Sequence, residues 1–233
     1  KAKETYSLGQ SDILVADTLI MMDSSSIVLN KLKGENYIRV KYARFGNYCT
    51  IDGKGIDGKP GRNGINGVTP TGPCINGSPG KDGTRGLDGT KAVNLFLYLQ
   101  KVVIKGQLII DLSGGHGGIG GNGGNGGGGS PGTRHCNGGN GANGGTAGQG
   151  GNGGKGGTLN VTLATPQDFR DYVLANKIVV KNMGGNAGPS GKGGYHGSAG
   201  LGPSKKNGKD GEPGPYNSSG ISGENGSLFV QAN

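Results

Sequence analysis

The sequence predicts a mainly β fold in which a short β-solenoid or sandwich platform carries a bundle of about six polyglycine-II helices. Two observations favour this fold. Glycine recurs with a period of three through three long segments, and short apolar segments of strand length separate them. The composition agrees, because 56 of 233 residues are glycine and only 30% are hydrophobic. Average glycine usage is about 7%, so backbone hydrogen bonds must supply more of the stability here than an apolar core does.

The central glycine tract has three distinct rows. Every third residue from Gly114 to Gly156 is glycine at thirteen of fifteen positions, and His135 and Ala147 are the exceptions. A second row, from Gly115 to Gly127, is all glycine, whereas the third row is mostly polar. In an extended helix with three residues per turn each row is a face, and a glycine face lets another backbone approach closely. We therefore expect two packed faces and one wet face. The alternative, a flexible linker, has no reason to keep this register.

Two outer segments repeat the period with one glycine row instead of two. Residues 53–91 contain GKPGRNG and GSPGKDGTRGLDG, which look like collagen, but collagen needs long uninterrupted runs and three chains. The break at 68–76 instead predicts two antiparallel arms joined by a turn. Residues 184–226 show the same pattern, with a turn after Gly200 and one lapse at Asn217.

The segments between the glycine excursions read as β structure. Short apolar or alternating runs fill residues 1–52, 93–112, 158–182 and 227–231. One short α-helix is expected near 166–175, with Thr165 as N-cap, proline at the first helical position and an acidic residue in the first turn. Since β segments and the excursions 53–91, 114–157 and 184–226 alternate, residues 1–233 are predicted to form a single intertwined domain.

The charge and the chain ends point to partners and location. The net charge of +9 suits polyanions such as surface glycans, although singly scattered lysines and arginines are also typical of simple solubility. Nucleic acid is not expected as a partner. No apolar run reaches the roughly 20 residues of a membrane span, so no transmembrane segment is expected. The sequence starts with Lys1 rather than methionine, and we expect an extracellular or cell-surface protein whose signal peptide has been removed.

Tests for catalysis find nothing. GxGxxG matches lie in glycine repeats with no following helix, and each Gly-Lys pair lacks the Ser or Thr of a phosphate-binding loop. The central tract has no acidic residue for calcium-binding repeats. His135 and Cys136 are adjacent, but one ligand of each kind is poor evidence for a metal site. We therefore expect no enzyme activity, no cofactor and no metal.

Parts of the sequence resemble known families. GGHGGIGGNGGNGGGGSPG and GGNGGKGG are similar to the springtail (snow flea) antifreeze protein, a small bundle of polyglycine-II helices, over the central tract only. The order NKLKGENYIRVKYARFGNYCTIDGKG, collagen-like triplets, NLFLYL, LIIDL and a GGNGG hairpin resembles glycine-rich secreted proteins of Bacteroidota across most of the chain. Asp17-Thr18-Leu19 matches the short O-glycosylation motif of that phylum, which implies a glycan on Thr18. A looser parallel is the adhesin at phage tail-fibre tips.

Together these observations predict a non-enzymatic, extracytoplasmic structural or recognition protein. The resemblance to Bacteroidota proteins implies a cell-surface subunit of an outer-membrane or adhesive assembly. Its expected partners are other surface or outer-membrane proteins, or anionic glycans. The alternatives are an ice-binding (antifreeze) protein, and a collagen-like trimeric fibre or phage-type adhesin.

Residues at the turns are the candidate binding site, because exposed turns accept functional side chains. Arg134 and His135 lie at the turn of the second excursion, and Lys205 and Lys206 lie at the turn of the third. The three cysteines allow at most one internal disulfide. Cys74 and Cys136 both lie at turns, so we expect them to be paired if the arms run side by side.

Overall fold

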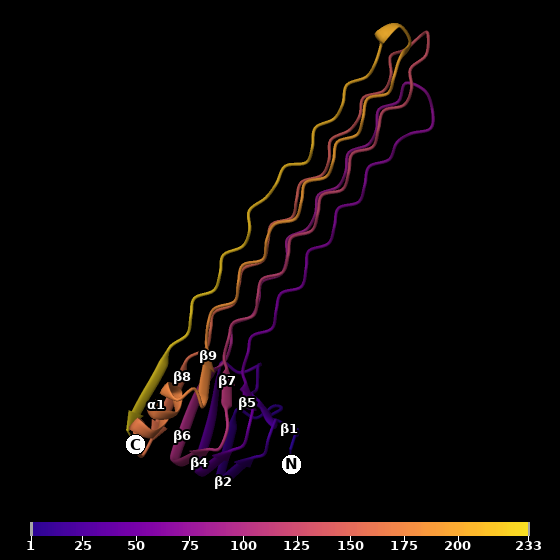
Figure 1. The fold of residues 1–233 in the computed structure, drawn as a ribbon. Helices are drawn as coiled ribbons and strands as arrows, with labels where there is room; N and C mark the ends of the chain where they lie inside the picture. Colours follow the sequence, from indigo (N-terminus) through magenta and orange to yellow (C-terminus); the bar gives the residue numbers. More distant parts are fainter. Residues whose placement is uncertain (1, 233) are drawn as a thin grey trace.

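The computed structural model describes residues 2–232 and has the shape of a rod with a broad base (Figure 1). The base is a β platform that holds both ends of the chain. Six extended glycine-rich arms run from it to the far end of the rod. We call them arm 1 (54–68), arm 2 (76–92), arm 3 (113–130), arm 4 (137–157), arm 5 (183–201) and arm 6 (207–226).

The platform consists of two five-stranded sheets in which every pairing is parallel. The strand orders are β1-β3-β5-β7-β9 in the first sheet and β10-β8-β6-β4-β2 in the second. The strands are β1 (Thr5–Ser7), β2 (Ile13–Met21), β3 (Ser26–Val28), β4 (Glu35–Phe45), β5 (Cys49–Asp52), β6 (Asn94–Ile104), β7 (Leu108–Asp111), β8 (Leu159–Leu163), β9 (Ile178–Lys181) and β10 (Leu228–Ala232). Helix α1 spans Pro166–Leu174, and a 3-10 turn spans Pro203–Lys205.

The predicted fold class is wrong. We expected a solenoid or sandwich platform with a bundle of about six polyglycine-II helices. The regular elements are instead two parallel sheets with one α-helix and one 3-10 turn, and no helix is assigned along the arms within residues 2–232. The physical reason is that consecutive strands alternate between the sheets, so each strand pairs with the next strand but one along the chain. Glycine spacing shows where backbones can meet, but it specifies neither this pairing nor a helix class.

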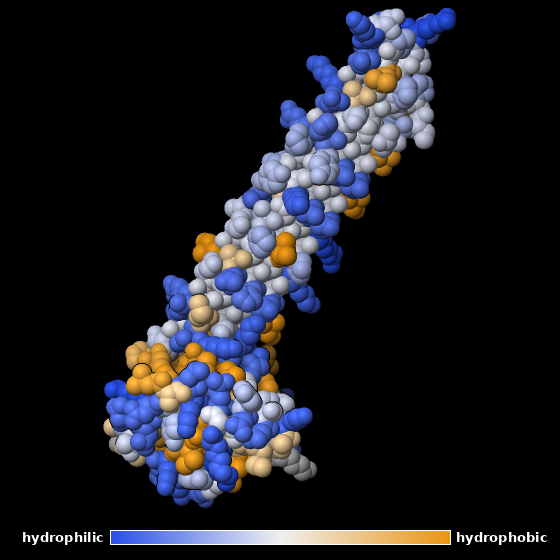
Figure 2. Space-filling model, in the orientation of Figure 1, coloured by the Kyte–Doolittle hydropathy of each residue, from blue (hydrophilic) through white to orange (hydrophobic). Residues whose placement is uncertain are grey.

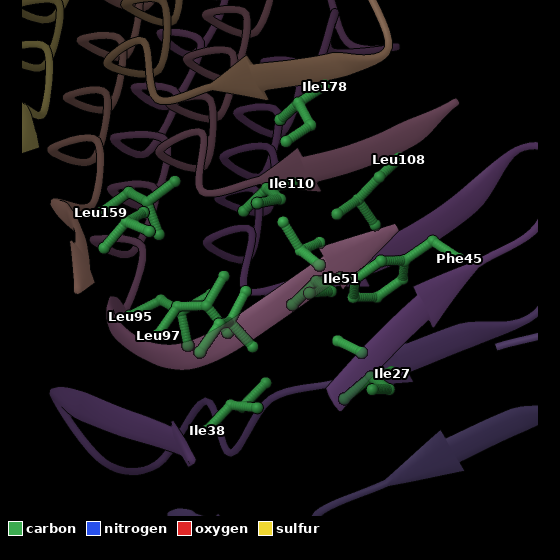
Figure 3. Packing of buried hydrophobic residues seen from close by; sticks show 14 of the residues in the cluster. Ile27, Ile38, Phe45, Ile51, Leu95, Leu97, Leu108, Ile110, Leu159 and Ile178 are labelled. Carbon is green, nitrogen blue, oxygen red and sulfur yellow. The ribbon is translucent and has the colours of Figure 1, made fainter. Parts of the chain in front are cut away.

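The apolar core fills the space between the two sheets. Ile51 and Ile110 from the first sheet meet Leu97 and Leu159 from the second, and all four side chains are at most 1% exposed. Figure 3 shows these side chains pointing into the interior from both sheets. Helix α1 adds the buried Phe169 to this core. Its Thr165 makes no side-chain capping hydrogen bond, contrary to the expected cap.

All three arm pairs are inserted at one corner of the platform. Each circuit of the chain crosses from a strand of the first sheet to a strand of the second. Between β1 and β2, and between β3 and β4, this crossing is a short link. Between β5 and β6, β7 and β8, and β9 and β10, it is a pair of arms. Arms 1, 3 and 5 therefore continue the first sheet outward, and arms 2, 4 and 6 return into the second sheet (Figure 1).

The register of the strands continues without a slip along the arms. In the first sheet Asp52 pairs with Asp111, which is 59 residues later. In the arms that follow, the N–H of Asn122 donates to Oδ1 of Asn63, again 59 residues apart. Spacings of 70, 64 and 69 residues likewise recur in the other strand pairs and in the arms attached to them. The platform therefore sets the alignment of the whole rod.

The number of glycine rows follows the number of neighbours. Arms 3 and 4 each exchange backbone hydrogen bonds with four other arms, whereas arms 1 and 6 do so with two. In arm 3, Gly117 donates to the carbonyl of Asn186 at 2.9 Å, and Gly118 donates to that of Leu87 at 2.8 Å. Two adjacent glycine rows thus form hydrogen bonds to neighbours on two different sides of the arm. This explains why the central tract has two glycine rows and the outer tracts have one.

Asparagines in the third row bridge neighbouring arms. Asn122 donates its N–H to Asn63, and its own Oδ1 accepts the N–H of Lys192, both at 2.8 Å. One turn earlier the row holds Ile119, which offers no acceptor, and position 189 in the next arm is a proline without an N–H. The polar row is exposed or half-buried, and its amides satisfy backbone groups that would otherwise lack a partner within the rod.

Two lapses in the glycine register meet in space. Ala147 in arm 4 and Asn217 in arm 6 each replace a glycine of a periodic row. The structure places them together, and Nδ2 of Asn217 donates to the carbonyl of Ala147 at 3.3 Å. The two non-glycine residues are therefore joined by a hydrogen bond between arms 4 and 6.

Two neighbouring glycines give the sharpest test of the arm packing. A Cβ at residue 127 would overlap the carbonyl of Val68, whereas a Cβ at residue 128 would meet nothing nearer than 3.5 Å. We expect Gly127→Ala to lower the free energy of unfolding by about 1–3 kcal/mol or more. Gly128→Ala should be neutral or stabilise by about 0.4–1 kcal/mol, because it restricts the unfolded chain. Guanidinium denaturation measures both, and equal losses would contradict the packing.

A pH dependence follows from Asp57 in arm 1. The pKa of its carboxyl is lowered because the carboxylate accepts the N–H of His116 at 2.8 Å, with a further contribution from the charge of Lys54. The folded pKa lies below the unfolded one, so this contribution is complete at neutral pH and is lost as the pH falls below about 4. Asp57→Asn keeps an acceptor and should reduce the loss of stability between about pH 7 and pH 3. An unchanged acid profile in denaturant titrations would contradict this role.

Candidate binding tip

Three turns meet at the end of the rod that is far from the platform (Figure 1). They cover residues 69–75, 131–136 and 202–206, which we call the tip. Cys74 in the first turn donates its N–H to the carbonyl of Pro131 at 2.8 Å. Gly132 in the second turn donates to Leu201, next to the third turn, also at 2.8 Å. The tip is thus one hydrogen-bonded unit.

A disulfide joins the first two turns. Cys74 and Cys136 are bonded, and their Cα atoms are 6.0 Å apart. The second turn is closed by the N–H of Thr133, which donates to the carbonyl of Cys136 at 2.9 Å. The third cysteine, Cys49, is a free thiol buried in the platform. The disulfide therefore links arms 1 and 2 to arms 3 and 4 at the end where no sheet holds them.

The third turn holds two residues in the left-handed region. Ser204 has φ of 55° and Lys205 has φ of 64°, a backbone conformation that costs non-glycine residues about 1–3 kcal/mol each. Lys206 donates its N–H to Pro203 at 3.2 Å, and Gly202 donates to Oδ1 of Asn207 at 2.9 Å. Local hydrogen bonds thus hold the two lysines in a tight, exposed turn.

The tip is cationic and contains no acid. Arg134, His135, Lys205 and Lys206 are exposed. Residues 68–76, 130–137 and 201–208 include no aspartate or glutamate. None of the ion pairs among the described residues involves the arginine or the two lysines. Figure 2 shows hydrophilic side chains projecting from this end of the rod.

The structure brings the predicted tip residues onto adjacent turns. Gly138, just after the turn that carries Arg134 and His135, donates its N–H to the carbonyl of Lys206 at 2.8 Å. Thr18, the expected glycosylation site, lies instead on β2 of the platform, where it is exposed. The tip and the glycosylation motif therefore occupy opposite ends of the molecule.

No group of three or more His, Cys, Asp or Glu side chains that could hold a metal ion lies within residues 2–232. His116 has a structural contact, because its Nδ1 accepts the N–H of Asn186 at 2.9 Å. No helix in the same part of the chain is long and apolar enough to cross a membrane.

The sequence did not predict the groove on the outer surface of the platform. A groove of about 610 Å³ lies on the outer face of the second sheet, where Val15, Arg39 and Tyr98 stand in register on neighbouring strands. Alternation in each strand indicates which residues face outward. It gives no register between strands that lie 24 and 59 residues apart, so these side chains were not recognised as neighbours.

Comparisons with known proteins assign no family to this chain. No protein-family model matches the chain, and neither does any curated protein. A solved structure of the springtail antifreeze protein from Granisotoma rainieri, described as a nine polyproline type II helical bundle, is 26% identical. The match covers 71% of this chain and 95% of that chain, but the TM-score is 0.12. At that score the likeness carries no argument about fold or function.

The tip disulfide makes a prediction that thiol counting can check. The unreduced, denatured protein should show the thiol of Cys49 alone, and reduction should expose all three thiols. The bond spans 62 residues, so Cys74→Ser should lower the free energy of unfolding by about 2–4 kcal/mol through loop entropy. Cys49→Ser is the control for thiol loss and should leave the bond intact. Three reactive thiols before reduction would contradict the pairing.

Proposed function

We propose that this protein is a non-enzymatic, extracytoplasmic structural and recognition protein that presents a cationic tip to anionic glycans. The observation that carries the proposal is the tip itself. Arg134, Lys205 and Lys206 are exposed on adjacent turns with no acid in those turns. Guanidinium and ammonium groups bind carboxylate and sulfate through charge-assisted hydrogen bonds.

The rod supports this role by fixing the tip at a distance from the platform. Hydrogen bonds between arms recur from the sheets up to the turns, so the arms are braced along their whole length. A disulfide then ties two of the turns together. Disulfides persist in oxidising compartments, which supports a location outside the cytoplasm. Turns whose backbone is already ordered lose less entropy on binding than flexible loops do.

The expected alternatives gain less support. Ice binding needs a flat face of regularly spaced groups, but the asparagines of the polar rows bridge neighbouring arms, and Lys192 and Tyr195 interrupt the same face. A collagen-like trimer needs partner chains for its glycine N–H groups, whereas arms of one chain satisfy them here. A docked subunit of a larger surface assembly remains compatible with a glycan-binding tip.

Binding to an anionic polysaccharide tests the proposal. The probe is alginate, with neutral dextran as the matched polymer, at about physiological ionic strength. The tip variant is Arg134→Ser with Lys205→Ser and Lys206→Ser. The control variant removes three exposed lysines from the arms, namely Lys59→Ser, Lys81→Ser and Lys192→Ser. Both variants lose the same net charge.

We expect the wild-type protein to bind alginate and not dextran. The tip variant should bind at least about tenfold more weakly, because three paired cations contribute about 0.5–1 kcal/mol each. The arm variant should stay within about threefold of wild type. Equal weakening in both variants would show that net charge alone drives binding, and absence of binding by the wild type would refute the proposal.

A further inference from the structure

The two ends of the platform differ in whether another element covers their terminal strands. At one end α1 packs against β9 and β10, and Phe169 of this helix is 1% exposed. At the other end β1 and β2 are the edge strands of their sheets, and no described element lies beyond them. Stacked β structures normally cover their terminal layer, because an open edge exposes core side chains and backbone groups. Within residues 2–232, one end of the platform is therefore covered by α1, and the outer edges of β1 and β2 at the other end are open.

Strand β2 has few of the features that usually protect an edge. It spans nine residues, Ile13–Met21, with no proline, glycine or lysine, and Asp17 is its single charged residue. Ile13 is 54% exposed, Val15 67% and Ile20 52%. A long, apolar and exposed edge strand is a template for pairing with another chain.

The core is also accessible at this end. A groove of about 420 Å³ runs between β1 and β2. Leu14, Leu19 and Met21 from β2 line it together with Ile27 from β3. Side chains of one further strand would fill this groove in the way that each successive circuit of the platform fills the space above the one before it.

The backbone groups of β2 alternate between β4 and the open edge. Asp12 accepts the N–H of Tyr37 from β4, so in the first half of β2 the backbone groups of Leu14 and Ala16 face β4, and those of Ile13 and Val15 face outward. The hydroxyl of Ser11 bonds both the N–H and the carbonyl of Ile13, at 3.2 and 3.0 Å. Val15 is the next residue whose N–H and carbonyl are directed to the open side.

Charge distinguishes between possible occupants. The outermost layer at this end, residues 2–23, contains Glu4, Asp12, Asp17 and Asp23 but only one cation, Lys3, so this layer carries −3 although the whole chain carries +9. A second copy docked by the same end would bring these acids together, because a two-fold interface pairs the same surface with itself. A basic strand complements the end, as β4 already shows through the 2.7 Å ion pair between Lys41 and Asp17.

We propose that the open edge of β2 and the groove beside it bind an extended segment of another protein, alternately apolar and basic. Its backbone pairs with the outward groups of β2, its apolar side chains enter the groove, and its basic side chains meet the acids of this end. This interaction surface is separate from the tip and does not depend on glycan binding there.

The chain itself supplies a suitable probe. Strand β4, with the sequence ENYIRVKYARF, occupies the equivalent position on the other edge of β2 and has the required alternation. Ile38 and Val40 are buried, whereas Arg39 and Lys41 face outward. A fluorescent synthetic peptide of residues 35–45, with a scrambled peptide as control, can be titrated against the full-length protein by fluorescence anisotropy.

We expect saturable binding of the peptide below about 1 mM and none of the scrambled peptide. Val15→Pro removes an outward N–H without removing a bond to β4, and should weaken binding at least about tenfold. Ser219→Pro, which adds proline to an exposed stretch of arm 6, should leave binding unchanged. Asp17→Lys keeps the backbone edge and should weaken binding about threefold or more through charge alone. Circular dichroism melting confirms that each variant is folded.

Three results would overturn the proposal. The first is failure of the wild-type protein to bind the peptide. The second is equal binding of the scrambled peptide, or unchanged binding in folded Val15→Pro and Asp17→Lys. The third is a concentration-dependent dimer in sedimentation that Val15→Pro abolishes, which would assign the edge to a second copy of this chain instead.

Discussion

The hydrogen bond from a glycine N–H to a carbonyl of the neighbouring arm is the interaction on which the rod depends. It requires backbones to approach so closely that a Cβ has no room. At Gly121, for example, a Cβ would overlap the carbonyl of Arg62. Glycine therefore fills most positions where an arm faces another, with Ala147 an exception, and arms 3 and 4, which have four neighbours each, carry it in two rows. The high glycine content and the number of glycine rows in each arm follow from this close approach of backbones.

The platform fixes the register between neighbouring arms, which the arms cannot fix for themselves. Glycine rows allow contact at any multiple of three residues, so an isolated bundle could slip along its length. The sheets remove this freedom, because apolar side chains such as Leu97 and Ile110 fit the core in one register. The same residue spacings then run through strands and arms. Asparagine bridges and the tip disulfide add further fixed points, so the turns are held by contacts that begin at the far end of the molecule.

Local chemistry could be predicted from the sequence, and long-range pairing could not. Glycine is the residue that lacks a Cβ, so the spacing of glycines in the sequence identifies the arms. The prolines and cysteines between the glycine repeats identify the turns. Helix α1 could likewise be placed from Pro166. The two parallel sheets were missed because they join strands 59–70 residues apart, and no local pattern encodes such a pairing. The contact of Asn217 with Ala147 and the open edge of β2 depend on that pairing, so they too were invisible.

Residue-resolved amide hydrogen exchange tests the central claim most directly, because it reads each backbone hydrogen bond without a substitution. The account predicts that the N–H groups of Gly118, Gly121 and Gly124 in arm 3 exchange as slowly as those of Leu97 and Leu99 in β6, since arms and sheets form one hydrogen-bonded unit. Exchange of these glycines at the rate of an unstructured chain, with β6 still protected, would show that the arms are independent flexible loops and would contradict the account.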